Sequence, residues 1–284
     1  MTIEITSERV ELSVDGDAVD VHYRTGGDGP PLLFLHGIGL DAATVSWRRA
    51  LPALAADRTV YALDLPGHGE SDKPDRAYTT EYYLTVVEEF LDAVGVNEPA
   101  IAGLSMGGAL ALGHALDGGD VERLVLVGSY GLGRDAYWRT AASGILQTPL
   151  LGGMLWQGVS GSKPAIRTGL RSMGAAEPPR QLVDDVASVV DRRTVRAMRR
   201  WQRSEFLQSG FKTDYSGRLS EVDAPTLLIH GVDDPLLPAS WSRRAATELP
   251  DGEAQILEDC GHCPPRERPE RVNGALRSFC AGEN

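Results

Sequence analysis

Short apolar runs alternate with stretches of helical spacing along the first half of the chain. The apolar runs, each short enough for a buried strand, lie at 19–25, 31–37, 59–65, 99–105 and 122–128. Apolar positions at helical spacing separate the last four of these runs, at 46–56, 80–94 and 106–116. Repeated strand and helix units predict a parallel sheet that is covered by helices on both faces.

This alternation stops in the middle of the chain and then resumes. Residues 134–218 hold 14 Lys and Arg against 7 Asp and Glu, whereas the rest of the chain holds 14 against 33. Helical spacing is present there at 181–202. Further strands follow at 224–231 and 253–260, with helices at 240–249 and 268–280. We therefore expect a core formed by 1–133 and 219–284, with a basic helical insertion, the cap, at 134–218.

Composition excludes several classes of protein. The 284 residues carry a net charge of −12, which disfavours nucleic acid or an anionic membrane as a partner. No apolar run approaches the roughly 20 residues that cross a bilayer. The first residues alternate between polar and apolar and include acids, unlike the basic start and apolar centre of a secretory signal. The three cysteines are too few for a disulfide framework. We expect a cytoplasmic protein that acts as a monomer or a homodimer.

A glycine-flanked serine follows one of the predicted strands. Gly103-Leu104-Ser105-Met106-Gly107 has the pattern G-x-S-x-G, directly after an apolar run and directly before a helix. Glycines two residues either side let the strand turn sharply and hold the serine in a strained conformation. This context predicts a nucleophilic serine. The backbone N–H of Met106, at the start of the helix, is placed to stabilise a developing oxyanion.

A serine hydroxyl needs a base, and the base needs an orienting acid. In an open parallel sheet, residues just after the strands gather at one edge, where ligands bind. The chain places an acid and then a histidine after its last two strands: Asp233 or Asp234, followed by His262. The order serine, acid, histidine suits this chemistry.

Several motifs together resemble the α/β-hydrolase fold, in the branch with a helical cap between strands six and seven. They are LFLHGIG, DLPGHGESDKP, AGLSMGG, LLIHGVDDPLLP and CGHCPPRERPERVN. The resemblance implies a mostly parallel sheet of eight strands. It also implies Asp234 as the acid, from its spacing to Gly231 and Pro238, with Asp233 as the alternative. The backbone N–H of Ile38 would be a second oxyanion donor, and no metal or organic cofactor is required.

A serine at position 105, where related branches have a nucleophilic aspartate, indicates attack on an acyl carbon. We expect hydrolysis of a carboxylic ester or lactone of a small to medium, largely apolar substrate through an acyl-enzyme. Relatives that hydrolyse carbon–carbon bonds of ring-cleavage products commonly have tryptophan after the catalytic histidine, where this chain has Cys263. That reaction remains an alternative, as does a receptor or regulatory partner that retains the triad.

The substrate pocket is less defined by sequence. Its candidate residues are His36, Gly37, Ser129, Trp138, Trp156, Trp201 and Cys263. The cap tryptophans could instead fill the core of the cap. The arginine-rich stretch at 191–203 could attract an anionic substrate or form a solvated helix face.

The cysteines on either side of His262 raise two further possibilities. Structural zinc needs four ligands, usually from two separated pairs, and no second pair is present. A redox pair would lie where a strand enters a helix, not after the last strand. We therefore expect His262 to act as the base and no metal to bind. Cys263 is expected to widen the pocket and to be sensitive to oxidation.

Overall fold

The computed structural model describes residues 3–136, 162–174, 176–207 and 209–282. Its main sheet has eight strands in the order β1-β2-β4-β3-β5-β6-β9-β10. These strands are β1 (Thr6–Val14), β2 (Asp17–Gly26), β3 (Pro31–Leu35), β4 (Thr59–Leu63), β5 (Ala100–Leu104), β6 (Arg123–Val127), β9 (Thr226–Gly231) and β10 (Gly252–Leu257). Strand β2 is antiparallel to β1 and to β4, and all other neighbours are parallel. The predicted mostly parallel sheet of eight strands is confirmed.

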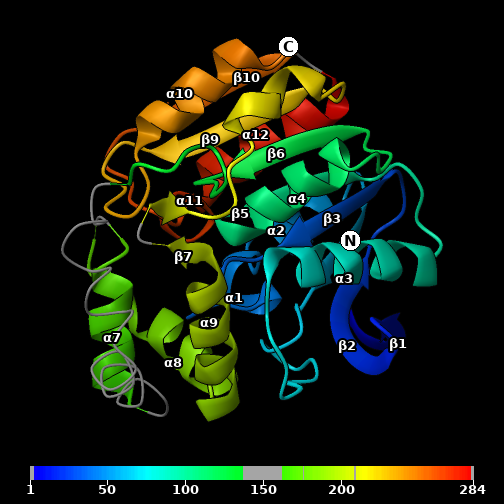
Figure 1. The fold of residues 1–284 in the computed structure, drawn as a ribbon, viewed down its shortest axis with the longest axis vertical. Helices are drawn as coiled ribbons and strands as arrows, with labels where there is room; N and C mark the ends of the chain where they lie inside the picture. The colour runs from blue at the N-terminus through cyan, green and yellow to red at the C-terminus, as the bar shows by residue number, and fades with distance from the viewer. Residues whose placement is uncertain (1–2, 137–161, 175, 208, 283–284) are drawn as a thin grey trace.

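Helices cover both faces of this sheet (Figure 1). They are α1 (Ala43–Ser46), α2 (Ala50–Leu54), α3 (Thr80–Ala93), α4 (Met106–Leu116), α10 (Ala239–Glu248), α11 (Pro264–Glu267) and α12 (Pro269–Ala281), with a 3₁₀ helix at Ser216–Glu221. Side chains from α3, α4 and α10 pack in one buried cluster, and side chains from α2 and α12 pack in another.

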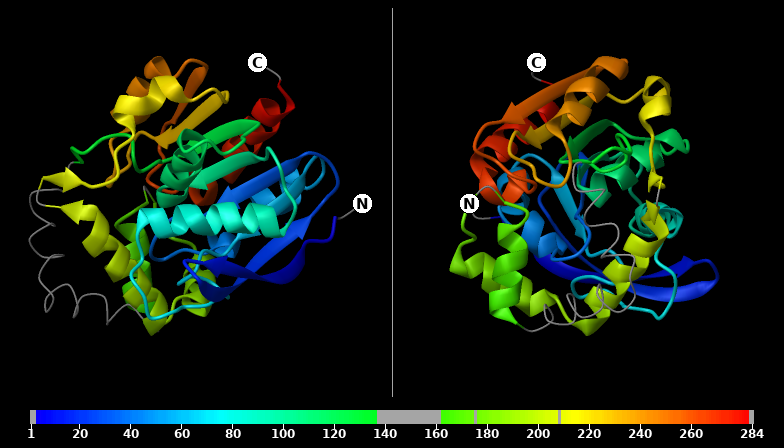
Figure 2. Two further views of the ribbon diagram at one scale, coloured as in Figure 1. Left: turned by 45° about the vertical axis from the view of Figure 1, so that its right-hand side comes forward. Right: turned by 60° about the vertical axis from the view of Figure 1, so that its left-hand side comes forward.

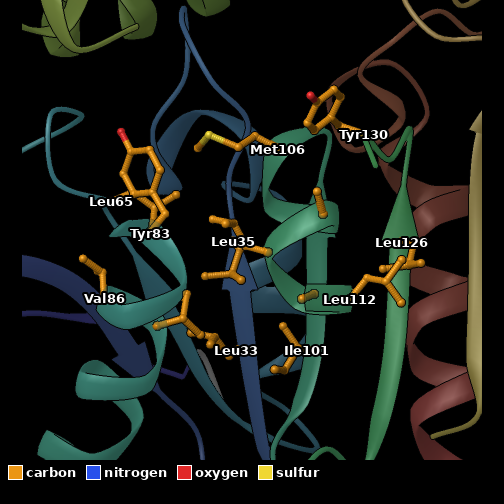
Figure 3. Packing of buried hydrophobic residues seen from close by; sticks show 14 of the residues in the cluster. Leu33, Leu35, Leu65, Tyr83, Val86, Ile101, Met106, Leu112, Leu126 and Tyr130 are labelled. Carbon is orange, nitrogen blue, oxygen red and sulfur yellow. The ribbon is translucent and has the colours of Figure 1, made fainter. Parts of the chain in front are cut away.

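The central strands alternate between these two clusters. In β3, Leu33 and Leu35 join the cluster of α3 and α4, whereas Leu32 and Phe34 join the opposite one. Figure 3 shows Leu33 and Leu35 beside Ile101 of β5 in the first cluster. Because both faces of each central strand are buried, its sequence is an uninterrupted apolar run. Burying each such side chain contributes roughly 1.5–3 kcal/mol.

The segment between β6 and β9 lies outside the main sheet. It includes α7 (Lys163–Arg171), α8 (Arg180–Val189), α9 (Arg192–Glu205) and a small hairpin of β7 (Phe206–Leu207) and β8 (Gly210–Phe211). The three helices form a group at one end of the molecule (Figures 1 and 2). Their apolar side chains share a third cluster with Leu40, Ala42 and Val45, which follow β3. The cap boundaries at 134 and 218 remain predictions.

The helical spacing at 181–202 corresponds to two helices rather than one. Val190 is extended, and the side chain of Asp191 accepts a hydrogen bond from the amide of Thr194 at 2.8 Å. An aspartate at this position caps a new helix, so the chain turns between α8 and α9 without losing the apolar spacing. Within the described ranges, none of the helices is both long enough and apolar enough to span a membrane.

Candidate active site

Ser105 lies on a sharp turn between β5 and α4. Its backbone has φ 54° and ψ −113°, a conformation that few residues other than glycine adopt. The flanking glycines are required sterically: a Cβ on Gly103 would lie 2.1 Å from the carbonyl oxygen of Gly107, and one on Gly107 would lie 2.3 Å from that of Leu35. The elbow therefore forms only because the backbone segments can approach this closely.

The loop after β3 places two backbone amides near the serine. Within the described part of the chain, the amides of Ile38 and Met106 have no hydrogen-bond partner. The adjacent His36 is fully buried; its Nε2 accepts from the amide of Leu65 at 3.0 Å, so its Nδ1 carries the proton donated to the Gly37 carbonyl. Both ring nitrogens thus shape the loop that presents Ile38.

Asp234 and His262 form a buried pair at the ends of β9 and β10. Oδ2 of Asp234 lies 2.7 Å from Nδ1 of His262. Oδ1 accepts from the amides of Leu236 and Leu237 at 2.7 and 3.0 Å. Burial alone would raise the pKa of Asp234, but the neighbouring histidines outweigh burial and hold that pKa well below its ordinary value. The carboxylate therefore stays ionised and orients His262.

The two candidate acids have different surroundings. Asp234 is 7% exposed and faces His262, whereas Asp233 is exposed and its amide donates to the carbonyl of Cys260. The structure thus brings Asp234, and not Asp233, to the histidine. The backbone bond of Asp233 holds the loop in the orientation that turns the next carboxylate inward.

A second histidine contacts the same carboxylate. Nε2 of His230, at the end of β9, lies 3.0 Å from Oδ2 of Asp234, and its Nδ1 lies 2.7 Å from Oγ of Ser242. From the sequence, His230 was not identified as a contact of Asp234. Its spacing of four residues from Asp234, directly before the glycine of the turn, was the available signal.

The loop that carries His262 is held through its backbone. The amide of His262 donates to the carbonyl of Met173, between α7 and α8, at 2.8 Å. The carboxylate of Glu267 in α11 accepts from the amides of Gly261 and Cys263 at 3.0 and 3.1 Å. Contacts from both the segment after α7 and α11 therefore position the histidine.

A buried ion pair links this loop to the loop after β3. Nη2 of Arg266 lies 2.5 Å from Oδ1 of Asp41, and the two side chains are 5% and 3% exposed. Oδ2 of Asp41 accepts from the amide of Gly37 at 2.9 Å. Burial alone would lower the pKa of Arg266, but Asp41 raises it overall. The pair thus connects the residue before Ile38 with the helix after His262, and sequence reasoning missed it.

Ser105 and His262 line a cavity of about 310 Å³. Its described walls are mostly apolar. They come from the loops after β3, β6 and β9 and from the helical segment and hairpin between β6 and β9: Ile38, Leu40, Tyr130, Met173, Met198, Trp201, Phe206, Phe211, Leu236 and Leu237. A smaller chamber of about 70 Å³ also contains Ser105 and His262, and is lined further by Gly37, Asp41, Cys263 and Arg266. The serine and the histidine therefore line both spaces, and the smaller one differs in also containing the charged pair of Asp41 and Arg266.

The comparisons with known proteins agree with this fold. The model of the alpha/beta hydrolase family matches residues 32–275. The chain belongs to this family. A relative in the alpha/beta hydrolase family is the 2-hydroxy-6-oxo-6-(2'-aminophenyl)hexa-2,4-dienoic acid hydrolase of Metapseudomonas resinovorans, which is 28% identical over 96% of this chain and 91% of its own length.

Solved structures show the same fold. A serine hydrolase involved in carbazole degradation superposes with a TM-score of 0.80 at 24% identity, covering 97% of this chain and 99% of the other. A thermophilic esterase from Thermogutta terrifontis superposes with a TM-score of 0.77 at 20% identity, covering 97% and 99%. These structural similarities show the fold. The family model identifies the chain as an alpha/beta hydrolase, and its substrate class is left to be proposed.

The pocket residues expected from sequence divide into three groups in this alpha/beta hydrolase. Trp201 lines the larger cavity, and Gly37 and Cys263 line the smaller chamber. His36 and Ser129 are fully buried and line neither; Ser129 instead donates to the carbonyl of Tyr130 at 2.8 Å. Trp138 and Trp156 lie outside the described residues.

The cysteines of this alpha/beta hydrolase are buried and free. Burial raises the pKa of Cys260 and of Cys263 to about 12, so neither is a thiolate at neutral pH. This argues against the expected sensitivity of Cys263 to oxidation, because the thiolate is the reactive form. Among the residues that the structure describes, no group of three or more His, Cys, Asp or Glu side chains could hold a metal ion.

Proposed function

We propose that this chain is a serine hydrolase that cleaves a neutral carboxylic ester or lactone through an acyl-enzyme on Ser105. The observation that carries the proposal is the hydrogen-bonded Asp234–His262 pair, which opens onto the same cavity as a serine on a strained elbow. A nucleophile, a base and an orienting acid in this arrangement are the parts that acyl transfer needs.

In the proposed course, Nδ1–H of His262 is held by Asp234, which leaves Nε2 to accept the proton of Ser105. The serine oxygen attacks the acyl carbon, and the amides of Ile38 and Met106 stabilise the resulting oxyanion. His262 then gives its proton to the departing alcohol. Water repeats these steps on the acyl-enzyme and releases the acid.

The cavity supports a small to medium, neutral substrate. Its volume of about 310 Å³ lies at the lower end of the range for ligand pockets. Among its described lining residues none is a lysine or an arginine, and Arg266 in the smaller chamber is already neutralised by Asp41. A carboxylate on the substrate would therefore find no unpaired cation along these walls.

Hydrolysis of a carbon–carbon bond is a second candidate. The relative from Metapseudomonas resinovorans, named for a 2-hydroxy-6-oxo-dienoic acid, matches over nearly its whole length. The ion pair between Asp41 and Arg266 disfavours such an acidic substrate, since binding a carboxylate there would compete with Asp41. For this reason we place ester hydrolysis first.

Two measurements test the proposal. Labelling with a fluorophosphonate should modify the wild-type protein and not Ser105→Ala. Turnover should then be compared between p-nitrophenyl esters of increasing acyl length and the dienoic acid of the relative. Faster turnover of the acid would favour the second candidate, and a protein that is neither labelled nor active on any of them would instead be a binder that retains the triad.

A further inference from the structure

Asp234 divides its hydrogen-bonding capacity between two histidines. Oδ2 accepts from Nδ1 of His262 at 2.7 Å and contacts Nε2 of His230 at 3.0 Å. Oδ1 is occupied by backbone amides. His230 is fully buried, so water does not compete for its ring. The catalytic carboxylate is thus shared, and the mechanism proposed above uses only one of its two histidines.

The surroundings of His230 determine where its proton lies. Nε2 faces two groups that only accept, Oδ2 of Asp234 and the carbonyl of Leu237 at 3.1 Å, so Nε2 must carry a hydrogen. Nδ1 faces Oγ of Ser242, a hydroxyl that can either donate or accept. His230 is therefore a donor to Asp234 whether its ring is neutral or protonated.

We propose that His230 is a positioning residue that competes with His262 for Asp234 and thereby sets the pH range in which the base works. This inference rests on the proposed function for the role of His262. An oxygen that already accepts one hydrogen bond attracts a second donor less strongly. Without His230, the bond from His262 to Asp234 strengthens and favours the protonated ring, which cannot accept the proton of the serine. The acid limb of the pH profile of kcat/KM then moves to higher pH.

Among the described residues, five other titratable groups lie near Asp234 and His262. Burial raises the pKa of Cys260 and Cys263 to about 12, which keeps both thiols neutral in the working range. Asp41 and Arg266 are paired with each other, and Glu267 accepts from the backbone of the histidine loop. All five remain when His230 is replaced, so a shifted profile reports the contact that was removed.

Two polar substitutions test the contacts of the two ring nitrogens of His230 one at a time. His230→Gln places an amide near the position of Nε2 and can still donate to Asp234. His230→Asn places its amide near the position of Nδ1 and reaches Ser242 only. We expect the acid midpoint of kcat/KM on a p-nitrophenyl ester to rise by about half to one pH unit in His230→Asn, because only part of the usual strength of a hydrogen bond to a charged group is transferred to the bond from His262. In His230→Gln the midpoint should stay closer to that of the wild type. His114→Gln, in α4, controls for loss of a histidine elsewhere.

A merely structural role gives a different result. Both substitutions would then lower the melting temperature and the rate while leaving the midpoint in place, which would overturn the inference. A second measurement uses the unaltered protein: ¹⁵N-correlated NMR of the histidine rings should show a hydrogen on Nε2 of His230. A neutral ring protonated only at Nδ1 would overturn the inference even if a variant failed to fold. Absence of fluorophosphonate labelling at Ser105 would instead contradict the proposed function, and the NMR result would still stand by itself.

Discussion

Removal of Arg266 should expose how strongly the two active-site loops are coupled. In Arg266→Met, Asp41 loses its only described ionic partner but keeps hydrogen bonds from the amides of Gly37 and Ala42 and from Oγ of Ser46. Breaking a buried pair costs about 3–5 kcal/mol because a charge remains without its partner. Because three donors still form hydrogen bonds to Asp41, we expect the free energy of unfolding to fall by about 3 kcal/mol, the low end of that range.

Replacing Asp41 instead of Arg266 should lower the free energy of unfolding further. In Asp41→Asn, the guanidinium of Arg266 stays buried, and its described hydrogen-bond acceptor is the hydroxyl of Ser46 at 2.9 Å. We expect a loss near 5 kcal/mol, the upper end for a buried unpaired charge. Asp41→Asn combined with Arg266→Met removes both charges and should cost less than the sum of the single changes, by about 2 kcal/mol or more.

Urea unfolding followed by fluorescence gives these values. A change in midpoint at constant m indicates a change in stability rather than in the extent of unfolding. Ester turnover, measured alongside, should fall more in Asp41→Asn, because Oδ2 of Asp41 holds the amide of Gly37 next to Ile38. Additive single and double variants, or a loss below about 1 kcal/mol in Arg266→Met, would refute the reasoning.

Three further predictions concern other parts of the molecule. Gly107→Ala should destabilise the protein by about 3 kcal/mol and abolish turnover, because the new Cβ would meet the carbonyl of Leu35. Gly274→Ala is the control: it lies in an exposed turn of α12 with no atom within 4 Å of a new Cβ, and should stabilise the protein by about 0.5–1 kcal/mol in the same unfolding assay. Folding lowers the pKa of Asp234, so the ionised carboxylate stabilises the protein at pH values above the ordinary carboxyl pKa of 3.8. The difference in unfolding free energy between the wild type and Asp234→Asn should therefore narrow when urea unfolding is measured below about pH 4. A difference that stays constant with pH would contradict this. The thiol of Cys263, protonated at pH 8, should react with iodoacetamide only after denaturation, as mass spectrometry would show, and rapid alkylation of the native protein would be contrary evidence.

Much of the fold could be predicted from the sequence because each buried strand has a local signature. The strand predicted at 31–37 is β3, and the helix predicted at 80–94 is α3, which ends one residue earlier. Ser105 could be located for the same reason, since its strained turn needs glycines two residues away. These features depend on neighbours in sequence, and the sequence therefore reveals them.

The contacts that complete the site depend on residues far apart. Asp41 and Arg266 are separated by more than 200 positions, and nothing near either residue indicates that it is paired. The contact of His230 is also hard to predict from sequence, although less so. His230 lies four residues from Asp234, but only the folded turn brings the two side chains together. Long-range pairing needs the fold before it can be recognised.

The hydrogen bond from the amide of His262 to the segment after α7 is the contact that the sequence could least reveal. Its acceptor is the main-chain carbonyl of Met173, which any residue at that position would supply. Substituting the Met173 side chain therefore leaves the bond in place, and side-chain substitution alone would not detect it. Deleting Met173 would instead displace the carbonyl and leave the buried amide of His262 unsatisfied, a cost of about 1–3 kcal/mol. This contact to His262 thus depends on the length of the segment after α7 and not on the side chain at position 173.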